Sequence, residues 1–184
     1  MIDNRYIYEL DIDLDMAYLT DLVKRMQFVT VPGMAAHHRI VADDPYMQRI
    51  KDQVPVLENI YNIYTIRTAS RLPLHVDTGR SSAFNIPISG TADSTTIFYN
   101  YVGAADVSKA DGIPANIYNI VTSPVEETFR FTLVQPVLID NTGPHEVINN
   151  GLTDRVSISW SFCAGVTFDQ AKDAFKKYSQ NKRA

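Results

Sequence analysis

The chain has 184 residues, of which 45% are hydrophobic and 21% are charged, values that fit one soluble globular domain with a buried core. A net charge of −4 and the lack of a long basic run argue against nucleic acid as a partner. The single cysteine, Cys163, excludes an internal disulfide, no apolar run reaches the length of a membrane span, and residues 1–5 do not resemble a signal peptide, so we expect a cytoplasmic protein.

Residues 1 to about 58 carry mostly helical signals. In the first of two segments, apolar residues recur at helical spacing, with acidic residues before them and basic residues near the end, which complements a helix dipole. Pro45 suits the first turn of a second helix. The predicted elements are strands at 5–13 and 28–31 and helices at 15–26 and 45–54. We expect His37 and His38 to lie in a loop, because a Pro-Gly pair precedes them.

From about 60 to 163 the sequence consists of short segments rich in aromatic and β-branched residues, separated by turn signals. The predicted strands are 61–66, 82–89, 96–102, 115–121, 128–134, 137–140, 145–149 and 155–162. Many short strands with regular turns predict a sandwich, a barrel or a jelly roll. A last helix is expected at about 167–179, so we expect a single, mainly β domain, 1–184, with flanking N- and C-terminal helices.

Two histidines and one aspartate form the first candidate site. His75 and Asp77 are spaced i and i+2, which places both side chains on one face of a strand. His145 is the leading candidate for a third ligand. Two imidazoles and a carboxylate without cysteine suit Fe(II) or Mn(II), and zinc less exclusively. The alternative is a hydrogen-bonded surface pair, because a lone His-x-Asp is common by chance.

The second candidate site lies in the segment 155–162, where polar and apolar residues alternate. Arg155 and Ser157 share the polar face of this strand. An arginine offers a planar fork of donors that fits a carboxylate, and a neighbouring serine hydroxyl can donate to the same group. Taken alone, the segment also fits a solvent-facing edge strand with an exposed arginine. The metal site and the anion site support each other, because a carboxylate-bearing co-substrate would connect them.

The order His-x-Asp, distal His, Arg-x-Ser resembles the 2-oxoglutarate/Fe(II)-dependent dioxygenase superfamily, over most of the chain. The resemblance implies a double-stranded β-helix with flanking helices, iron bound by His75, Asp77 and His145, and O2 as an oxidant. It also implies that Arg155, assisted by Ser157, binds the distal carboxylate of 2-oxoglutarate. The surroundings of the motifs look like small bacterial and phage proteins near the aspartyl/asparaginyl β-hydroxylases. Those enzymes lack the acidic ligand, so their substrate does not transfer to a chain with Asp77.

Four further residues are candidates around the site. Tyr61 and Tyr64 precede the His-x-Asp segment, a region where several relatives place a side chain that touches the keto acid, although core packing is an alternative role for Tyr64. Arg80 follows the ligand pair and can meet an anionic substrate, the keto acid or an acidic neighbour at the rim. Asn85 and Asn149 are candidate substrate residues, and Asn149 can also orient the distal histidine.

The resemblance implies an oxygenase that produces succinate and CO2, and we expect it to hydroxylate a small molecule, such as an amino acid, or a peptide side chain. One alternative is a cupin-type metalloenzyme with the same ligands, which has no need for Arg155 and Ser157. The other is a non-catalytic jelly-roll binding or structural module. The sequence leaves the substrate and the oligomeric state open.

Overall fold

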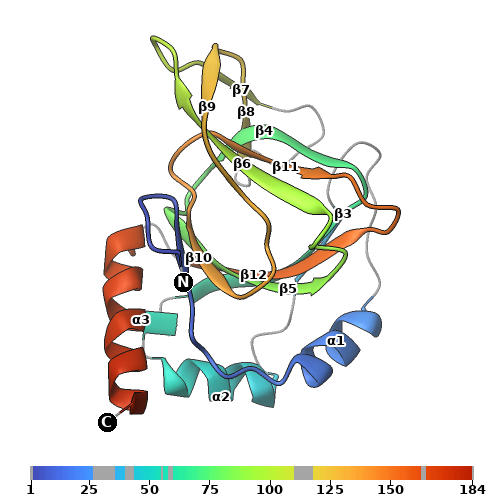
Figure 1. Ribbon diagram of the computed structural model, residues 1–184, viewed down its shortest axis with the longest axis vertical. Helices are drawn as coiled ribbons and strands as arrows, with labels where there is room; N and C mark the ends of the chain where they lie inside the picture. The colour runs from blue at the N-terminus through green and yellow to red at the C-terminus, as the bar shows by residue number, and fades with distance from the viewer. Residues whose placement is uncertain are drawn as a thin grey trace.

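The structure, a computed structural model, describes residues 2–26, 36–39, 44–54, 56–57, 60–109, 118–162 and 165–183 (Figure 1). The strands are β1 (Ile7–Glu9), β2 (Ala36–Arg39), β3 (Ile60–Thr68), β4 (Arg71–Asp77), β5 (Ser82–Ser89), β6 (Ser94–Tyr101), β7 (Val107–Lys109), β8 (Tyr118–Val121), β9 (Val125–Phe131), β10 (Val137–Asp140), β11 (His145–Asn149) and β12 (Arg155–Phe162). The helices are α1 (Met16–Lys24), α2 (Pro45–Gln53) and α3 (Phe168–Arg183).

The strands form two sheets that face each other (Figure 1). The first sheet has the order β1-β10-β5-β12-β3-β2, the second has the order β7-β8-β4-β11-β6-β9, and each contains six strands. Every pairing between the named strands is antiparallel, and most neighbours in a sheet are distant in the sequence. The fold is therefore a double-stranded β-helix, or jelly roll, with flanking helices, as the sequence predicts.

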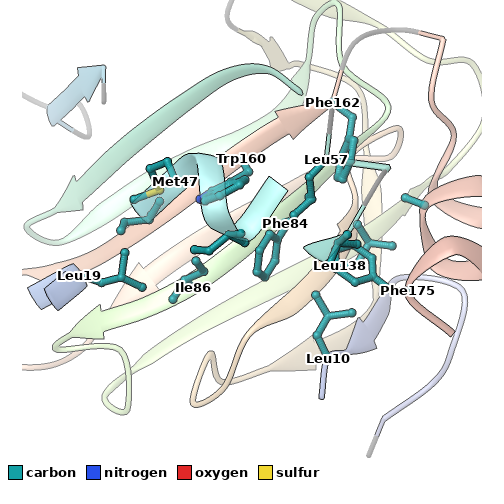
Figure 2. Packing of buried hydrophobic residues seen from close by; sticks show 14 of the residues in the cluster. Leu10, Leu19, Met47, Leu57, Phe84, Ile86, Leu138, Trp160, Phe162 and Phe175 are labelled. Atoms are coloured by element: carbon teal, nitrogen blue, oxygen red, sulfur yellow. The ribbon is translucent and has the colours of Figure 1, made fainter. Parts of the chain in front are cut away.

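The largest apolar cluster lies outside the sandwich, between the first sheet and the helices (Figures 1 and 2). Alternate residues of β12 supply its sheet side: Val156, Ile158, Trp160 and Phe162. Phe84 on the neighbouring strand β5 packs against Trp160 and against Phe175 of α3, with ring centroids 5.6 Å apart in both pairs. Because the helices cover this face, the polar residues of β12 point into the space between the sheets.

A second apolar cluster closes one end of the sandwich. Ile7 of β1 and Ile139 of β10 meet Phe98 of β6, and Tyr6 stacks on the same phenylalanine with ring centroids 5.0 Å apart. The cluster joins the two sheets on the side of β1, β10, β6 and β9. The middle of the sandwich, between β12 and the pair β4 and β11, remains polar.

Four strands have the bounds that the sequence predicts: β5, β10, β11 and β12. The helices at 15–26, 45–54 and 167–179 are present as α1, α2 and α3, and Asp15 and Asp44 cap the first two by accepting backbone N–H groups. The expected strand at 28–31 lies outside the described residues. None of the described helices is both long and apolar enough to cross a membrane.

One expectation was wrong. His37 and His38 are in β2, not in a loop, and β2 pairs with β3 at the edge of the first sheet. The region 1–58 thus contributes two strands, β1 and β2, as well as helices. The short strand β7 was not predicted either. Both β2 and β7 are short edge strands without an alternating apolar pattern, so their strand conformation depends on pairing with a distant neighbour.

Candidate metal centre

His75, Asp77 and His145 converge on the inner face of the second sheet. Antiparallel pairing sets His145 of β11 directly opposite His75 of β4, and their ring centroids are 4.3 Å apart. One potential ligand atom from each of the three residues lies within 4.8 Å of the others, and His75 Nε2 is 3.6 Å from Asp77 Oδ1. Donors on one face of an octahedral ion lie about 3 Å apart, so the three side chains must move closer together to share an ion.

Both imidazoles are oriented by the backbone that precedes them. Nδ1 of His75 lies 2.6 Å from the carbonyl oxygen of Pro73, and Nδ1 of His145 lies 2.9 Å from that of Gly143. A carbonyl only accepts, so Nδ1 carries the proton in each ring and donates it. A neutral ring that carries its proton on Nδ1 keeps a lone pair on Nε2, and this is the form that binds a metal.

Burial sets the charge state of the group. The His75 side chain is 1% exposed, and burial, followed by the neighbouring His145, lowers the pKa of His75 to about 3. Burial by itself would raise the pKa of Asp77, but Arg80 and the two histidines outweigh it, so this pKa is lowered. At neutral pH His75 is therefore neutral and Asp77 ionised, and both are in the protonation state of a metal ligand.

Arg80 binds Asp77 through both carboxylate oxygens. Its Nε lies 2.7 Å from Oδ2 and its Nη2 lies 2.9 Å from Oδ1. Its Nη1 donates to the Ser161 hydroxyl at 2.7 Å, which connects the second sheet to β12 of the first. Arg80 therefore contacts a candidate ligand directly, in place of the loose rim contact considered from the sequence.

Arg155 and Ser157 face the metal group from the opposite sheet. Both line a cavity between the sheets, together with Ile66, Leu72, His75, Asp77, Arg80, Asn85, Thr96, Ile139, Asn141, His145, Val147 and Ser159. Arg155 is 5% exposed and donates to the Ser157 hydroxyl at 3.1 Å, while its Nε has no hydrogen-bond partner among the described residues. Burial lowers the pKa of Arg155 to about 10, so the guanidinium stays charged at neutral pH.

Sequence reasoning missed two further buried hydroxyls, which belong to residues beside the site but not among those that line the cavity. Thr68 is the cross-strand partner of Arg155, and Tyr118 is the cross-strand partner of Asp77. Both hydroxyls are buried, and neither has a hydrogen-bond partner within the part of the chain that the structure describes. Only the register of paired strands reveals these neighbours. The one signal in the sequence is that Thr68 lies two residues after Ile66 in β3, so both side chains are on the same face, and Ile66 lines the cavity.

The remaining candidates separate into different environments. Asn85 lines the cavity from β5. The Asn149 amide donates to three backbone carbonyls, those of Thr68, Ala69 and Thr153, and its oxygen accepts the Gly151 N–H. Asn149 thus fastens neighbouring turns and is not among the residues that line the cavity. Tyr64 is in β3, opposite Ser159, and its side chain lies outside the described part of the structure.

The donor set fits a divalent metal such as Fe(II). Two imidazoles and one carboxylate from the same sheet leave the cavity side open for further ligands, and the cationic Arg155 stands across that cavity. An anion that spans the cavity would reach a metal held by the second sheet at one end and the donors of Arg155 on the first sheet at the other.

No family model and no curated protein matches the chain. Among solved structures, the non-heme alpha ketoglutarate dependent epimerase SnoN from nogalamycin biosynthesis has a TM-score of 0.56 at 12% identity over 85% of this chain and 76% of that chain. SnoN in complex with Fe3+, alpha ketoglutarate and nogalamycin RO has a TM-score of 0.56 at 10% identity, with coverage of 87% and 79%. A 2OG-Fe(II) oxygenase family oxidoreductase from Burkholderia pseudomallei has a TM-score of 0.45 at 12% identity, with coverage of 81% and 77%. At such identities the likeness to SnoN shows the double-stranded β-helix fold alone.

Proposed function

We propose that the protein is an Fe(II)- and 2-oxoglutarate-dependent oxygenase that hydroxylates a small, amino-acid-like molecule or a peptide side chain and releases succinate and CO2. The observation that carries the proposal is Arg155. It is a buried cation without an acidic partner among the described residues, and it lines the same cavity as His75, Asp77 and His145.

A buried guanidinium without a counter-ion is costly, because its desolvation is not repaid by a partner. A carboxylate bound in the cavity would supply that partner, and Ser157 would share it. The second carboxylate and the keto group of 2-oxoglutarate are then available to the metal. A cupin-type enzyme that does not use a keto acid has no requirement for this cation, so Arg155 favours the oxygenase over that alternative.

The residues of the chain have separate roles in this proposal. His75, Asp77 and His145 would hold Fe(II), which supplies the redox chemistry that activates O2 as the keto acid is oxidatively decarboxylated. Arg155 and Ser157 would fix the distal end of the keto acid. Apolar residues line part of the wall and limit the access of water: Ile66, Leu72 and Val147. SnoN, which shares the fold, is named as alpha ketoglutarate dependent, and this supports the proposal.

The proposal is tested anaerobically. Purified protein is loaded with Fe(II) and titrated with 2-oxoglutarate, and the visible charge-transfer band of the chelated keto acid is recorded. We expect the band in the wild-type protein and its loss in His145→Ala. The control is Asn100→Ala, which should keep the band, because Asn100 is an exposed residue of β6 that does not line the cavity. Fe(II) binding without a band would favour the cupin-type enzyme, and no Fe(II) binding would favour a non-catalytic module.

A further inference from the structure

Tyr118 contributes a buried hydroxyl to the inner face of the second sheet. The residue is the first of β8, it is 2% exposed, and its hydroxyl has no hydrogen-bond partner in the described ranges. Buried tyrosine hydroxyls usually find a partner, because an unpaired one loses its hydrogen bonds to water without replacement. A bound molecule that offers an oxygen atom would supply the partner that the described residues do not.

The neighbours of Tyr118 place it beside the metal group. Its cross-strand partner on β4 is Asp77, and residues opposite each other in an antiparallel pair share a face of the sheet. Its ring lies against the ring of His75, with centroids 4.7 Å apart. It also belongs to the apolar cluster of Ile66, Leu72 and Val147, all three of which line the cavity.

The chemistry of the missing partner follows from these surroundings. A tyrosine hydroxyl is protonated at neutral pH and can donate to an oxygen atom. Arg155 and Ser157, on the opposite sheet, are placed to bind the far end of a bound dicarboxylate. Tyr118 is on the sheet that holds the metal group and touches one of its histidines, so its partner belongs to the end of the ligand that reaches the metal.

We infer that the Tyr118 hydroxyl donates a hydrogen bond to the carboxylate of a 2-oxo acid at the end that chelates the metal, next to His75 and Asp77. The inference rests on the proposed function and adds a binding residue to it. Tyr118 would orient the chelating carboxylate, while Arg155 holds the distal one. Any 2-oxo acid, with or without a distal carboxylate, would depend on Tyr118, and only a dicarboxylate would depend on Arg155.

The test is Tyr118→Phe in the full chain, which removes the hydroxyl and keeps the ring. Anaerobic titrations of the Fe(II)-loaded protein with 2-oxoglutarate and with pyruvate give the dissociation constants from the charge-transfer band. A hydrogen bond to a charged group corresponds to a loss of at least about tenfold in affinity. We expect this loss for both acids in Tyr118→Phe, a shifted band maximum, and unchanged Fe(II) affinity. Arg155→Met should weaken 2-oxoglutarate alone.

Thermal unfolding without metal or keto acid provides a second readout. Removal of an unpaired buried hydroxyl should leave the melting temperature equal or higher, whereas a hydroxyl with a structural role would lower it. Tyr178→Phe is the matched control, because the Tyr178 hydroxyl of α3 donates to the Gln53 side chain of α2, away from the cavity. No band in the wild-type protein would remove the proposed function. A wild-type band with unchanged affinity and band position in Tyr118→Phe would overturn this inference alone, as would a loss of Fe(II) affinity or of melting temperature in that variant.

Discussion

Buried polar groups at the site fall into two kinds. His75, His145 and Asp77 all have protein partners that fix their orientation. Arg155 Nε and the Tyr118 hydroxyl lack partners in the described part of the chain. An unsatisfied buried donor costs about 1–3 kcal/mol, more when it is charged. The unliganded protein therefore carries a cost that an oxygen-rich anion in the cavity would relieve, and this is the physical basis for treating the cavity as a binding site.

Replacement of Arg155 by methionine tests this view. Methionine keeps an unbranched apolar chain but removes the charge and the donors. We expect the dissociation constant of 2-oxoglutarate to rise by about 100-fold, because a bidentate, charge-assisted contact is lost. Fe(II) affinity should stay the same, because Arg155 is on the sheet opposite the candidate ligands. The charge-transfer titration measures the first quantity, and calorimetry under anaerobic conditions measures the second.

The free energy of unfolding of the unliganded Arg155→Met protein should not fall, since a buried cation without an acidic partner among the described residues is removed. Arg130→Met is the control, because Arg130 is exposed and pairs with Glu127 on β9, outside the cavity. Equal 2-oxoglutarate affinity in Arg155→Met and wild type would withdraw Arg155 from its assigned role.

Sequence patterns identified those site residues that lie two positions apart in one strand, because this spacing places their side chains on the same face. His75 and Asp77 share a strand face by their i, i+2 spacing, and Arg155 and Ser157 do so by the same rule, and the structure places all four around one cavity. Tyr118 and Thr68 escaped notice because their relation to the site depends on the register of strands far apart in the sequence. No local pattern gives that register.

At the scale of single elements, β12 has two faces with different tasks. Its apolar residues pack under the helices, its polar residues enter the cavity, and all eight residues are buried. This alternation is long and regular, which is why the strand could be predicted with its bounds. The short strands β2 and β7 carry no such pattern, and they become strands only through pairing with β3 and β8.

Gly90, in the turn after β5, packs closely against the start of β12, which carries Arg155. Gly90 has φ +61°, and a Cβ at this position would lie 2.3 Å from the carbonyl oxygen of Asp154, the residue before Arg155. Gly90→Ala must therefore displace the start of β12. We expect a lower melting temperature and a 2-oxoglutarate affinity reduced by about tenfold or more, since small displacements of a positioning residue weaken a site strongly.

Gly103→Ala is the control that separates the effect of the clash at Gly90 from the effect of backbone strain. Gly103 also has a positive φ, +88°, but a Cβ there meets nothing within 4 Å. Both variants carry the cost of a non-glycine residue in a left-handed conformation, of about 1–3 kcal/mol. Only Gly90→Ala should also lose affinity for the keto acid in the charge-transfer titration. Equal affinities in the two variants would show that Asp154 does not control Arg155.

In the whole molecule, the site exists only because the two sheets face each other. The candidate metal ligands belong to the second sheet, and Arg155 and Ser157, the candidate anion-binding pair, belong to the first. The number of short strands and turns predicted a sandwich, a barrel or a jelly roll, and the resemblance of the motifs selected the jelly roll among them. The order of strands within the sheets could not be predicted, because it is decided by packing and pairing over long sequence separations. The sequence could therefore not show that the predicted ligands lie close together. The antiparallel pairing of β4 with β11 places His145 opposite His75.

Burial of the metal group between the sheets couples the stability of the entire fold to pH. Because the pKa of His75 is lowered to about 3 in the folded protein, from 6.5, the unfolded chain binds one more proton between these values. Stability is therefore full above pH 6.5 and falls as the pH is lowered toward 3, and the lowered pKa of Asp77 acts in the same direction at still lower pH.

Each pH unit in this range corresponds to about 1.4 kcal/mol, so we expect the free energy of unfolding of the metal-free protein to drop by about 2 kcal/mol between pH 7 and pH 5. Urea denaturation at the two pH values measures this drop. His75→Gln, which cannot take up a proton but can still donate to the Pro73 carbonyl, should flatten the dependence. If His75→Gln and the wild-type protein lost the same free energy between pH 7 and pH 5, the acid sensitivity would come from other groups, because only a buried neutral imidazole at position 75 makes the two curves diverge.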